Sequence, residues 1–208
     1  MVDSTSPVEV KQALRSSVAS ARRVRDEIAR RDDDEARTDR VLDLVRARWP
    51  HPGAVIGCYL SQAPEPDTLA LVSSLQSLGH RVLAPILSRR AGIGVPRPIA
   101  WAWYQGPGSL APGFHQIPEP LGDVLPATAL RGADLVIASG LAGGLDGSRV
   151  GTGGGWFDRA LTQLDPDVPV WMLLNDSEVV ASIAQEPHDR HMTLIVTPTR
   201  SLTTSVRE

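Results

Sequence analysis

Short apolar runs separated by helical segments constrain the fold of this 208-residue chain more than any other feature. Five runs have the length and composition of buried strands: Ala54–Leu60, His80–Leu87, Ala133–Ala138, Val168–Leu174 and Thr193–Val196. Helical patterns between them cover Thr68–Leu78, which Gly79 would cap, Trp156–Gln163 and Ser177–Ala184. Such alternation indicates a mainly parallel sheet with helices on both faces. We therefore expect an α/β fold, as a single three-layer domain over residues 1–208.

The N-terminal part predicts two helices. Apolar residues recur at three- and four-residue steps over Val8–Arg30, and Pro7 suits the first turn of that helix. A charged break is expected over Arg31–Glu35, followed by a second helix over Ala36–Trp49 that ends before a proline. The three consecutive aspartates in the break favour a solvated turn over a metal site, because consecutive side chains do not converge on one ion.

Residues 88–132 differ from the rest of the chain. They are rich in proline and glycine and contain the aromatic residues Trp101, Trp103, Tyr104 and Phe114. Long irregular stretches in compact domains are usually functional or disordered, and clustered aromatic residues argue against disorder. We expect an ordered stretch.

Composition excludes several classes of protein. The net charge of −3 gives no general attraction to nucleic acid or to membranes. The apolar runs are shorter than a membrane span, and the polar N-terminus lacks the core of a signal peptide. Cys58 is the only cysteine, so internal disulfides are excluded and a reducing cytoplasm is expected. Cys58 itself is expected in the core.

A glycine loop is the strongest local signal. Gly151, Gly153, Gly154 and Gly155 follow Arg149 and precede an aromatic pair. Glycine is costly in backbone entropy, so such a cluster indicates positive φ angles or close approach of a ligand to the backbone. Backbone N–H groups before a helix form a phosphate site, although a flexible turn is the alternative. Ligands of parallel sheets bind in loops at the carboxyl ends of strands, as this one is expected to be.

Two common phosphate-binding motifs do not match this loop. A Walker A loop requires a lysine directly after its last glycine, and none is present. A dinucleotide fingerprint is matched by Gly151 and Gly153, and Asp176 could imitate its ribose-binding acid. Trp156, however, occupies the last small-residue position, where it would prevent close packing of helix on strand.

Five segments together resemble those of the 5-formyltetrahydrofolate cyclo-ligases. The glycine loop, residues 149–159, is similar to the family signature Arg-Leu-Gly-x-Gly-x-Gly-Tyr-Tyr-Asp-Arg. The other four occur in the family's order: Lys11-Gln-Ala-Leu-Arg15, Tyr59-Leu60 followed by Glu65-Pro-Asp-Thr68, Ile117-Pro-Glu-Pro120, and Glu186-Pro-His-Asp189 with an apolar strand leading to Thr197. Each motif is weak alone, but the resemblance covers almost the whole chain.

The resemblance implies an enzyme that uses ATP and Mg²⁺. In this family the formyl oxygen of 5-formyltetrahydrofolate is thought to attack the γ-phosphate of ATP. N10 then attacks the activated carbon, and loss of phosphate gives 5,10-methenyltetrahydrofolate. Such chemistry depends on positioning and charge stabilisation rather than on a protein nucleophile. A soluble monomer with a small-molecule substrate is expected, with no nucleic acid or membrane partner.

The resemblance also implies roles for individual residues. Lys11 and Arg149 would act on the transferred phosphate, and Lys11 is the only lysine in the chain. Lys11 and Arg15 stand four apart, so they project from one helix face, where a solvated basic face is the alternative. The full set expected to contact ATP is Lys11, Gln12, Ala13, Leu14, Arg15, Arg149, Val150, Gly151, Thr152, Gly153, Gly154, Gly155, Trp156 and Phe157.

Asp158 and Asp189 match the family's magnesium positions, and one or two carboxylates with water and phosphate suffice for Mg²⁺. Helix capping is the alternative role for Asp158. Glu65 would accept hydrogen bonds from the pterin, unless it is a solvent-facing turn residue. The residues expected to contact the folate are Leu60, Glu65, Thr152, Gly153, Gly154, Gly155 and Trp156. Trp156 could equally pack in the core.

The chain departs from the family pattern at four places. Ser139-Gly-Leu-Ala-Gly143-Gly144 lacks the usual aromatic residue and carboxylate, and Trp156-Phe157 replaces two tyrosines. His115 replaces an aromatic ring, and Glu178 a glutamine. These changes are expected to affect the substrate side more than the phosphate side. They leave two alternatives open: a divergent relative that uses ATP on another substrate, and a non-catalytic nucleotide-binding protein with the same fold.

Overall fold

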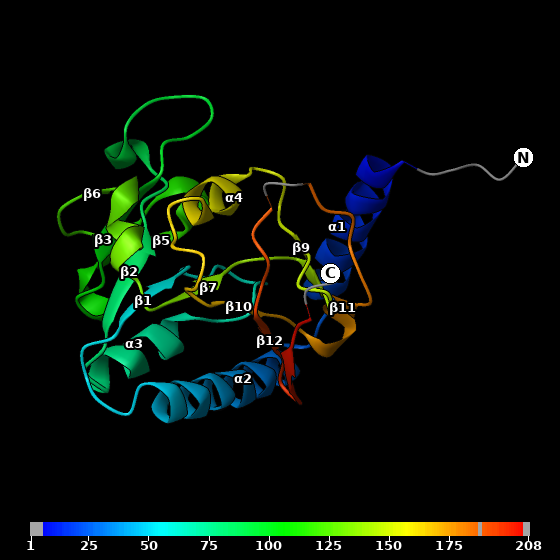
Figure 1. Ribbon diagram of the computed structural model, residues 1–208, viewed down its shortest axis with the longest axis horizontal. Helices are drawn as coiled ribbons and strands as arrows, with labels where there is room; N and C mark the ends of the chain where they lie inside the picture. The colour runs from blue at the N-terminus through cyan, green and yellow to red at the C-terminus, as the bar shows by residue number, and fades with distance from the viewer. Residues whose placement is uncertain (1–5, 187–188, 206–208) are drawn as a thin grey trace, which may run out of the picture.

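An eight-stranded sheet forms the centre of the protein in a computed structural model that describes residues 6–186 and 189–205 (Figure 1). Its order is β13-β12-β10-β7-β1-β2-β3-β6. The strands are β1 (Val55–Cys58), β2 (Arg81–Pro85), β3 (Ala100–Trp103), β6 (Leu125–Pro126), β7 (Leu135–Ala138), β10 (Val170–Leu173), β12 (Leu194–Val196) and β13 (Ser201–Thr203). The five apolar runs of the sequence provide the five central strands, which are mutually parallel. Antiparallel pairs occur only toward the two edges.

Helices cover both faces of this sheet. The helices α2 (Glu27–Arg48) and α3 (Leu69–Ser77) lie on one side, and α4 (Trp156–Leu161) lies on the other (Figure 1). One core cluster contains side chains from these three helices together with those of the central strands. The expected α/β architecture with a mainly parallel, covered sheet is therefore confirmed, and Cys58 lies fully inside its core.

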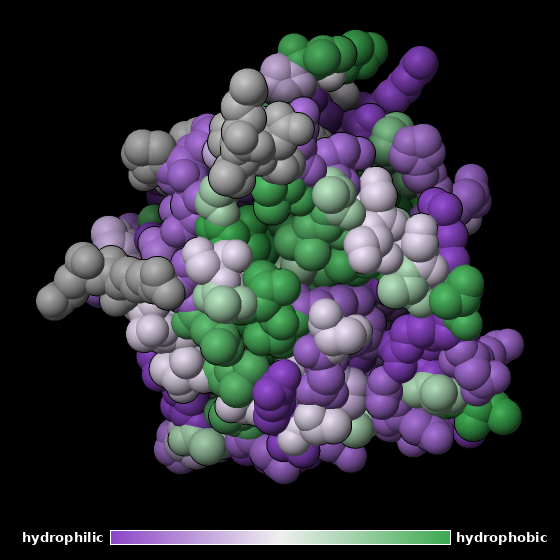
Figure 2. All heavy atoms as spheres, turned by 90° about the vertical axis from the view of Figure 1, so that its right-hand side faces the viewer, coloured by the Kyte–Doolittle hydropathy of each residue, from purple (hydrophilic) through white to green (hydrophobic). Residues whose placement is uncertain are grey.

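The helix α1 (Pro7–Arg23) packs on a second, smaller sheet rather than on the main one. This sheet has the order β11-β8-β9 and consists of β8 (Ala142–Gly144), β9 (Arg149–Val150) and β11 (Val179–Val180). A separate apolar cluster, which includes Val18, Leu141 and Ile183, joins it to α1. Figure 2 views the molecule from the side on which α1 and β11 lie in Figure 1, and apolar residues gather in the middle of that face.

The predicted break between the first two helices was wrong by several residues. The chain turns at residues 24–26, where the Asp26 carboxylate caps α2 by accepting the N–H groups of Ile28 and Ala29. The aspartate run therefore lies inside α2. Two of its members pair with arginines nearby in the chain, Asp33 with Arg25 across the turn and Asp34 with Arg37 within α2, so ion pairs stabilise a segment whose composition suggested a turn.

The helix predicted over Ser177–Ala184 was also wrong. A single 3₁₀ turn, Asp176–Glu178, leads directly into β11. Val179 and Val180 pair in parallel with Gly143 and Gly144 of β8. β-branched residues suit a strand, and a partner strand that is distant in sequence decided between the two possibilities.

Residues 88–132 are ordered, as the aromatic residues predicted. Besides β3 and β6 they form a hairpin of β4 (Leu110–Pro112) and β5 (Pro118–Pro120). Trp101 is fully buried in the core, and Trp103 packs against it from the surface. Four 3₁₀ turns connect these strands: Arg89–Ala91, Pro107–Ser109, Phe114–Gln116 and Ala127–Gly132.

Candidate active site

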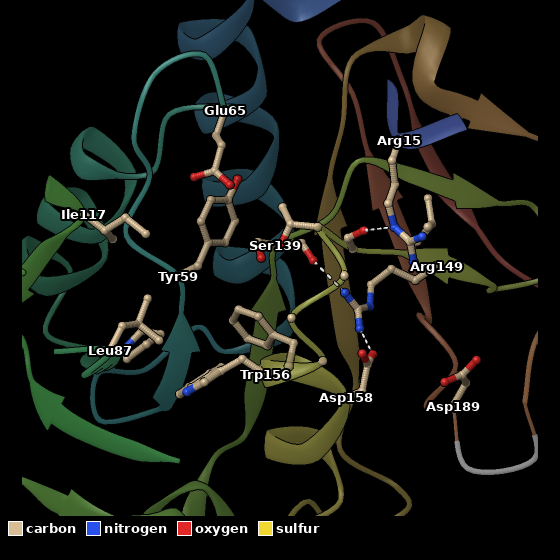
Figure 3. A pocket seen from close by; sticks show the side chains of 18 of the residues that line it. Arg15, Tyr59, Glu65, Leu87, Ile117, Ser139, Arg149, Trp156, Asp158 and Asp189 are labelled. Atoms are coloured by element: carbon tan, nitrogen blue, oxygen red, sulfur yellow. Dashed lines mark hydrogen bonds and ion pairs between the residues drawn. The ribbon is translucent and has the colours of Figure 1, made fainter. Parts of the chain in front are cut away.

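A cleft of about 410 Å³ lies at the carboxyl ends of the central strands (Figure 3). Tyr59 and Leu60 enter it directly after β1, Leu87 after β2, and Ser139 after β7. The glycine loop and α1 form another part of its wall. The lining residues are Val8, Lys11, Arg15, Tyr59, Leu60, Glu65, Pro85, Leu87, Ile117, Pro118, Ser139, Arg149, Val150, Gly151, Thr152, Gly153, Gly154, Gly155, Trp156, Phe157, Asp158, Glu186 and Asp189. Residues from all five sequence motifs therefore line one cavity.

The glycines of the loop serve two different purposes. Gly153 and Gly155 have φ angles of 98° and 59°, which L-residues with side chains rarely adopt. A Cβ atom at Gly151 would lie 2.8 Å from the Arg149 guanidinium, so this glycine leaves room for that side chain. At Gly154 a Cβ atom would meet no atom within 4 Å, so here the missing side chain leaves the backbone open to the cleft.

Arg149 is the central cation of the site. Only 6% of its side chain is exposed; its guanidinium forms an ion pair with Asp158 and donates a 3.1 Å hydrogen bond to the Ser139 carbonyl (Figure 3). Burial lowers the pKa of Arg149, and the charges of Asp158 and Asp189 oppose that shift. A buried cation with two nearby carboxylates is ready to exchange them for a phosphate.

Helix α1 brings its two predicted cations to the same region. The Lys11 ammonium lies 3.9 Å from the Asp189 carboxylate, and Arg15 donates a 3.0 Å hydrogen bond to the Gly151 carbonyl. The expected shared helix face is confirmed by these positions. The three residues between them do not line the cleft: Gln12 and Ala13 are exposed, and Leu14 packs on the small sheet.

The two predicted magnesium ligands also reach the cleft. Asp158 comes from the first turn of α4 and Asp189 from the segment between β11 and β12, and both lie near the same arginine. Within residues 6–186 and 189–205 no group of three or more His, Cys, Asp or Glu side chains forms a metal centre. Pro187 and His188 of the fifth motif lie outside the described residues. Two carboxylates beside Lys11 and Arg149 could hold a Mg²⁺ ion that arrives with a phosphate, since Mg²⁺ takes few protein ligands.

A different chemistry marks the opposite side of the cleft. Glu65 is half-buried, and burial raises the pKa of its carboxyl group. The Tyr59 hydroxyl donates a 2.9 Å hydrogen bond to the Pro66 carbonyl, and Thr68 donates a 2.7 Å hydrogen bond to the Tyr59 carbonyl. The Glu-x-x-Thr segment is thereby fixed to the end of β1, with Glu65 facing the cleft (Figure 3).

Trp156 both packs and lines the cleft. Its ring makes edge contacts with Trp101 and Phe157, each at a centroid distance of 5.1 Å. Its indole N–H donates a 3.3 Å hydrogen bond to the Pro98 carbonyl. The two roles that the sequence left open therefore combine, because one side of the ring faces the core and another the cavity.

Sequence reasoning missed several residues of the wall. No role was expected for Tyr59, Leu87 or Ser139, although Tyr59 and Leu87 lie at the carboxyl ends of predicted strands and Ser139 directly follows one, where ligands of parallel sheets bind. Ile117 and Pro118 were quoted only as part of a motif. The Glu119 carboxylate of that motif is buried and accepts hydrogen bonds from the N–H groups of Leu87 and Ser88, so it joins two segments of the wall.

Several of the residues that depart from the family pattern lie away from the cleft. Gly143 and Gly144 lie in the interior of the small sheet, where added Cβ atoms would collide with Met172 and Ser148. Glu178 is buried and forms an ion pair with Arg22 of α1 at 2.7 Å. His115 is exposed on the hairpin. Gly143, Gly144, Glu178 and His115 do not line the cleft, whereas Ser139, Trp156 and Phe157 of the departing segments do.

Comparison with known proteins decides which family has this fold and cleft. The family model described as "5-formyltetrahydrofolate cyclo-ligase family" matches residues 7–198. The chain belongs to this family. A 5-formyltetrahydrofolate cyclo-ligase of Mycolicibacterium smegmatis (strain ATCC 700084 / mc(2)155) is 32% identical over 192 residues, covering 92% of this chain and 95% of the relative. The expected membership in a family of ring-closing ligases is confirmed.

Two solved cyclo-ligase structures share the fold at low sequence identity. The 5,10-methenyltetrahydrofolate synthetase of Aquifex aeolicus superposes with a TM-score of 0.73 at 19% identity, covering 96% of this chain and 94% of the other. That of Mycoplasma pneumoniae gives 0.68 at 16% identity, covering 90% and 98%. In the described part of this cyclo-ligase family member, no helix is long and apolar enough to cross a membrane.

Proposed function

We propose that this protein catalyses the ATP- and Mg²⁺-dependent cyclisation of 5-formyltetrahydrofolate to 5,10-methenyltetrahydrofolate, with release of ADP and phosphate. The observation that carries the proposal is the meeting of two chemically different walls in one cleft. One wall is cationic and glycine-rich, and the other combines the half-buried carboxyl group of Glu65 with aromatic and apolar side chains. A phosphate donor and a pterin require these two environments side by side.

The cationic wall supports the phosphate part of the reaction. Lys11, Arg15 and Arg149 converge on the glycine loop from two elements. As the formyl oxygen attacks the γ-phosphate, negative charge develops on the phosphate oxygens and on the leaving ADP. Cations that are fixed in advance stabilise that charge without reorganisation during the reaction.

The opposite wall supports folate binding. Ionised Glu65 would accept hydrogen bonds from the amino and ring N–H groups of the pterin. Leu60 and Trp156 would pack on the ring, as apolar and aromatic residues do in most ligand pockets. Binding there would point the formyl group toward the cationic wall, which we also call the phosphate wall. It would hold N10 beside the formyl carbon, so that N10 attacks this carbon once the formyl oxygen is phosphorylated.

Asp158 and Asp189 are the residues that would hold magnesium. When bound, the ion would neutralise phosphate charge and help to orient ATP. Replacing either aspartate by asparagine should raise the Mg²⁺ concentration needed for half-maximal rate, because a neutral amide is a weaker ligand. An unchanged Mg²⁺ dependence in both variants would show that the ion binds elsewhere.

The direct test is to mix purified protein with ATP, Mg²⁺ and 5-formyltetrahydrofolate and to follow the absorbance of methenyltetrahydrofolate. Product formation that requires all three components is the expected result. Intact ATP binding without product would refute the proposal. It would leave a relative that uses ATP on another substrate, or a non-catalytic nucleotide-binding protein.

We further propose that the protein acts as a monomeric single domain in the cytoplasm, with no nucleic acid or membrane partner. The buried thiol of Cys58 and the net charge of −3 are consistent with this setting. Gel filtration with light scattering tests the oligomeric state.

A further inference from the structure

The segment that contributes Leu87 and Ile117 to the apolar wall of the cleft carries more positive than negative side chains. Between residues 86 and 122 the sequence contains three arginines and one carboxylate, although the chain as a whole is negative. The carboxylate, Glu119, is buried and bound to backbone N–H groups. One arginine, Arg90, donates to the carbonyls of Leu121 and Gly122. Within the described residues, no ion pair or side-chain hydrogen bond is found for Arg89 or Arg97.

The backbone at Arg97 is fixed directly to the cleft wall. The carbonyl of Arg97 accepts a 3.0 Å hydrogen bond from the Arg159 guanidinium, and the next carbonyl, of Pro98, accepts one from the Trp156 indole. Both donors belong to α4, which follows the glycine loop. Arg97 is therefore held next to Trp156, a residue that lines the cleft.

The side chain of Arg97 packs on Phe114, in the segment that precedes Ile117 of the cleft wall. Its guanidinium carbon lies 3.3 Å from the centroid of the Phe114 ring. Phe114 belongs to the turn before Ile117, which lines the cleft, and the Ile117 N–H donates to the Phe114 carbonyl. Stacking uses the flat face of a guanidinium, so the N–H groups at its edge stay available.

No acidic side chain neutralises this guanidinium. Among residues 6–186 and 189–205, no ion pair or side-chain hydrogen bond of Arg97 is found, and the charge of the nearby Glu119 is satisfied by backbone N–H groups. Arg97 is half-buried, so its charge is partly shielded from water. A half-buried, pre-oriented arginine without a carboxylate partner is suited to binding one from a ligand.

We propose that Arg97 binds a carboxylate of the glutamate tail of the reduced folate. The inference rests on the proposed function, since it concerns the far end of the same substrate. The phosphate-binding cations lie on the other side of the cleft from Leu87 and Ile117 (Figure 3). An aminobenzoyl group that leaves the pterin site along these two apolar residues brings its glutamate to the stacked Arg97.

The test compares Arg97→Gln with the unaltered chain on two substrates. One is 5-formyltetrahydrofolate, and the other is the amide of 5-formyltetrahydropteroic acid, which keeps N10 and the benzoyl group but has no carboxylate. For the folate we expect KM to rise about tenfold, as for loss of one charge-assisted hydrogen bond. For the amide, the substitution should leave KM unchanged. With either substrate, kcat and the KM for ATP should be the same in Arg97→Gln as in the unaltered chain.

Arg81→Gln is the matched control. The Arg81 guanidinium stacks on Trp103 at 3.8 Å, but Arg81 is the first residue of β2, whereas the cleft lies beyond the carboxyl end of that strand, at Leu87. Arg97→Lys keeps the charge without the planar edge, so its KM should fall between those of Arg97→Gln and the unaltered chain. Added salt should raise the KM of the unaltered chain for the folate, because salt screens the interaction between Arg97 and the carboxylate. The KM of Arg97→Gln should not depend on salt in this way.

An equal rise of KM for both substrates, or no rise for the folate, would overturn the inference. So would a change of the same size in Arg81→Gln. Product formation by the unaltered chain tests the proposed function separately. If that chain makes no product, direct titration with 5-formyltetrahydrofolate gives the same comparison as a ratio of Kd values, and a ratio near one rejects the role of Arg97.

Discussion

Single residues of the cleft are held in charge states that burial disfavours. The Glu65 carboxyl group has a pKa above its ordinary value because burial penalises the ionised form. Arg149 keeps its charge in a buried position because Asp158 pairs with it. A ligand that donates hydrogen bonds to Glu65, or that brings negative charge to Arg149, offsets the cost of burying these charges. Ligand binding at both residues should therefore depend on their electrostatics.

The raised pKa of Glu65 predicts a pH effect. If the ionised form binds the pterin, kcat/KM for the folate should be full above this pKa and fall as the pH drops through it. The fall should begin above the ordinary glutamate range of about 4.3. Glu65→Gln should lower kcat/KM and remove this dependence. A pH–rate profile that keeps its acid limb in the variant would contradict the assignment.

The same substitution has a predictable effect on stability. A raised pKa means that the folded protein binds the proton more tightly than the unfolded chain, so ionised Glu65 destabilises the fold at neutral pH. Glu65→Gln should therefore raise the unfolding midpoint at pH 7, and the gain should shrink as the pH falls through the folded-state pKa. Thermal unfolding at several pH values measures this difference.

The cations of the phosphate wall should affect the two substrates unequally. Lys11→Ala and Arg149→Ala should each raise the KM for ATP by about tenfold or more, because a charged partner of the phosphate is lost. Folate binding should change much less. Arg23→Ala is the control, because Arg23 lies on the same helix as Lys11 but is exposed and outside the cleft. Equal losses for both substrates would show that the two walls are misassigned.

At the scale of elements, the glycine loop and α4 form one unit. Gly155 ends the loop in a left-handed conformation and precedes the first turn of α4. Within that turn Asp158 faces back toward Arg149, and Trp156 faces the cavity (Figure 3). The sequence placed these residues within one motif, and the geometry of the turn directs them to different parts of the cleft.

Gly154→Ala tests whether the open backbone of the loop is used. The structure has no atom within 4 Å of the added Cβ, and Gly154 has no positive φ angle, so the fold should tolerate the change. We expect an unchanged unfolding midpoint and a KM for ATP raised about tenfold, because the methyl group occupies the ligand's approach. Gly132→Ala is the control, since Gly132 is equally unobstructed but outside the cleft. Unchanged ATP kinetics in Gly154→Ala would show that the ligand does not approach there.

At the scale of the whole molecule, one buried ion pair fixes α1 to the rest of the protein. The Arg22 guanidinium contacts both oxygens of Glu178, at 2.7 and 2.8 Å, and donates to the Gly140 carbonyl. Glu178 also accepts the N–H of Asn175. Since Lys11 belongs to the same helix, the position of the phosphate wall depends on this pair.

Glu178→Gln leaves the Arg22 charge buried without its partner. We expect a loss of about 3 kcal/mol in the free energy of unfolding, as is typical when one member of a buried pair is removed. The KM for ATP should rise more than that for the folate. Asp43→Asn is the control, because the Asp43–Arg46 pair is exposed and should contribute less than about 1 kcal/mol. Equal stabilities of the two variants would refute this role.

The sequence predicted most of the central sheet but not the placement of α1. Strands such as β7 and β10 consist of continuous apolar residues, and this local pattern is sufficient for a buried parallel strand. The break near Asp26 and the strand at Val179 were missed because ion pairs and a distant partner strand determine them. Local periodicity contains no information on such partners.

The sequence alone determined the family, the α/β class and most of the residues that line the cleft. These follow from local patterns and from motifs that keep their order along the chain. Only the tertiary structure decided that Glu178 and Gly143 lie away from the cleft, that Glu119 connects two of its walls, and that Arg97 stacks beside it. The physical reason is that burial and pairing depend on segments that meet only after folding, and a residue's neighbours in the chain do not specify them.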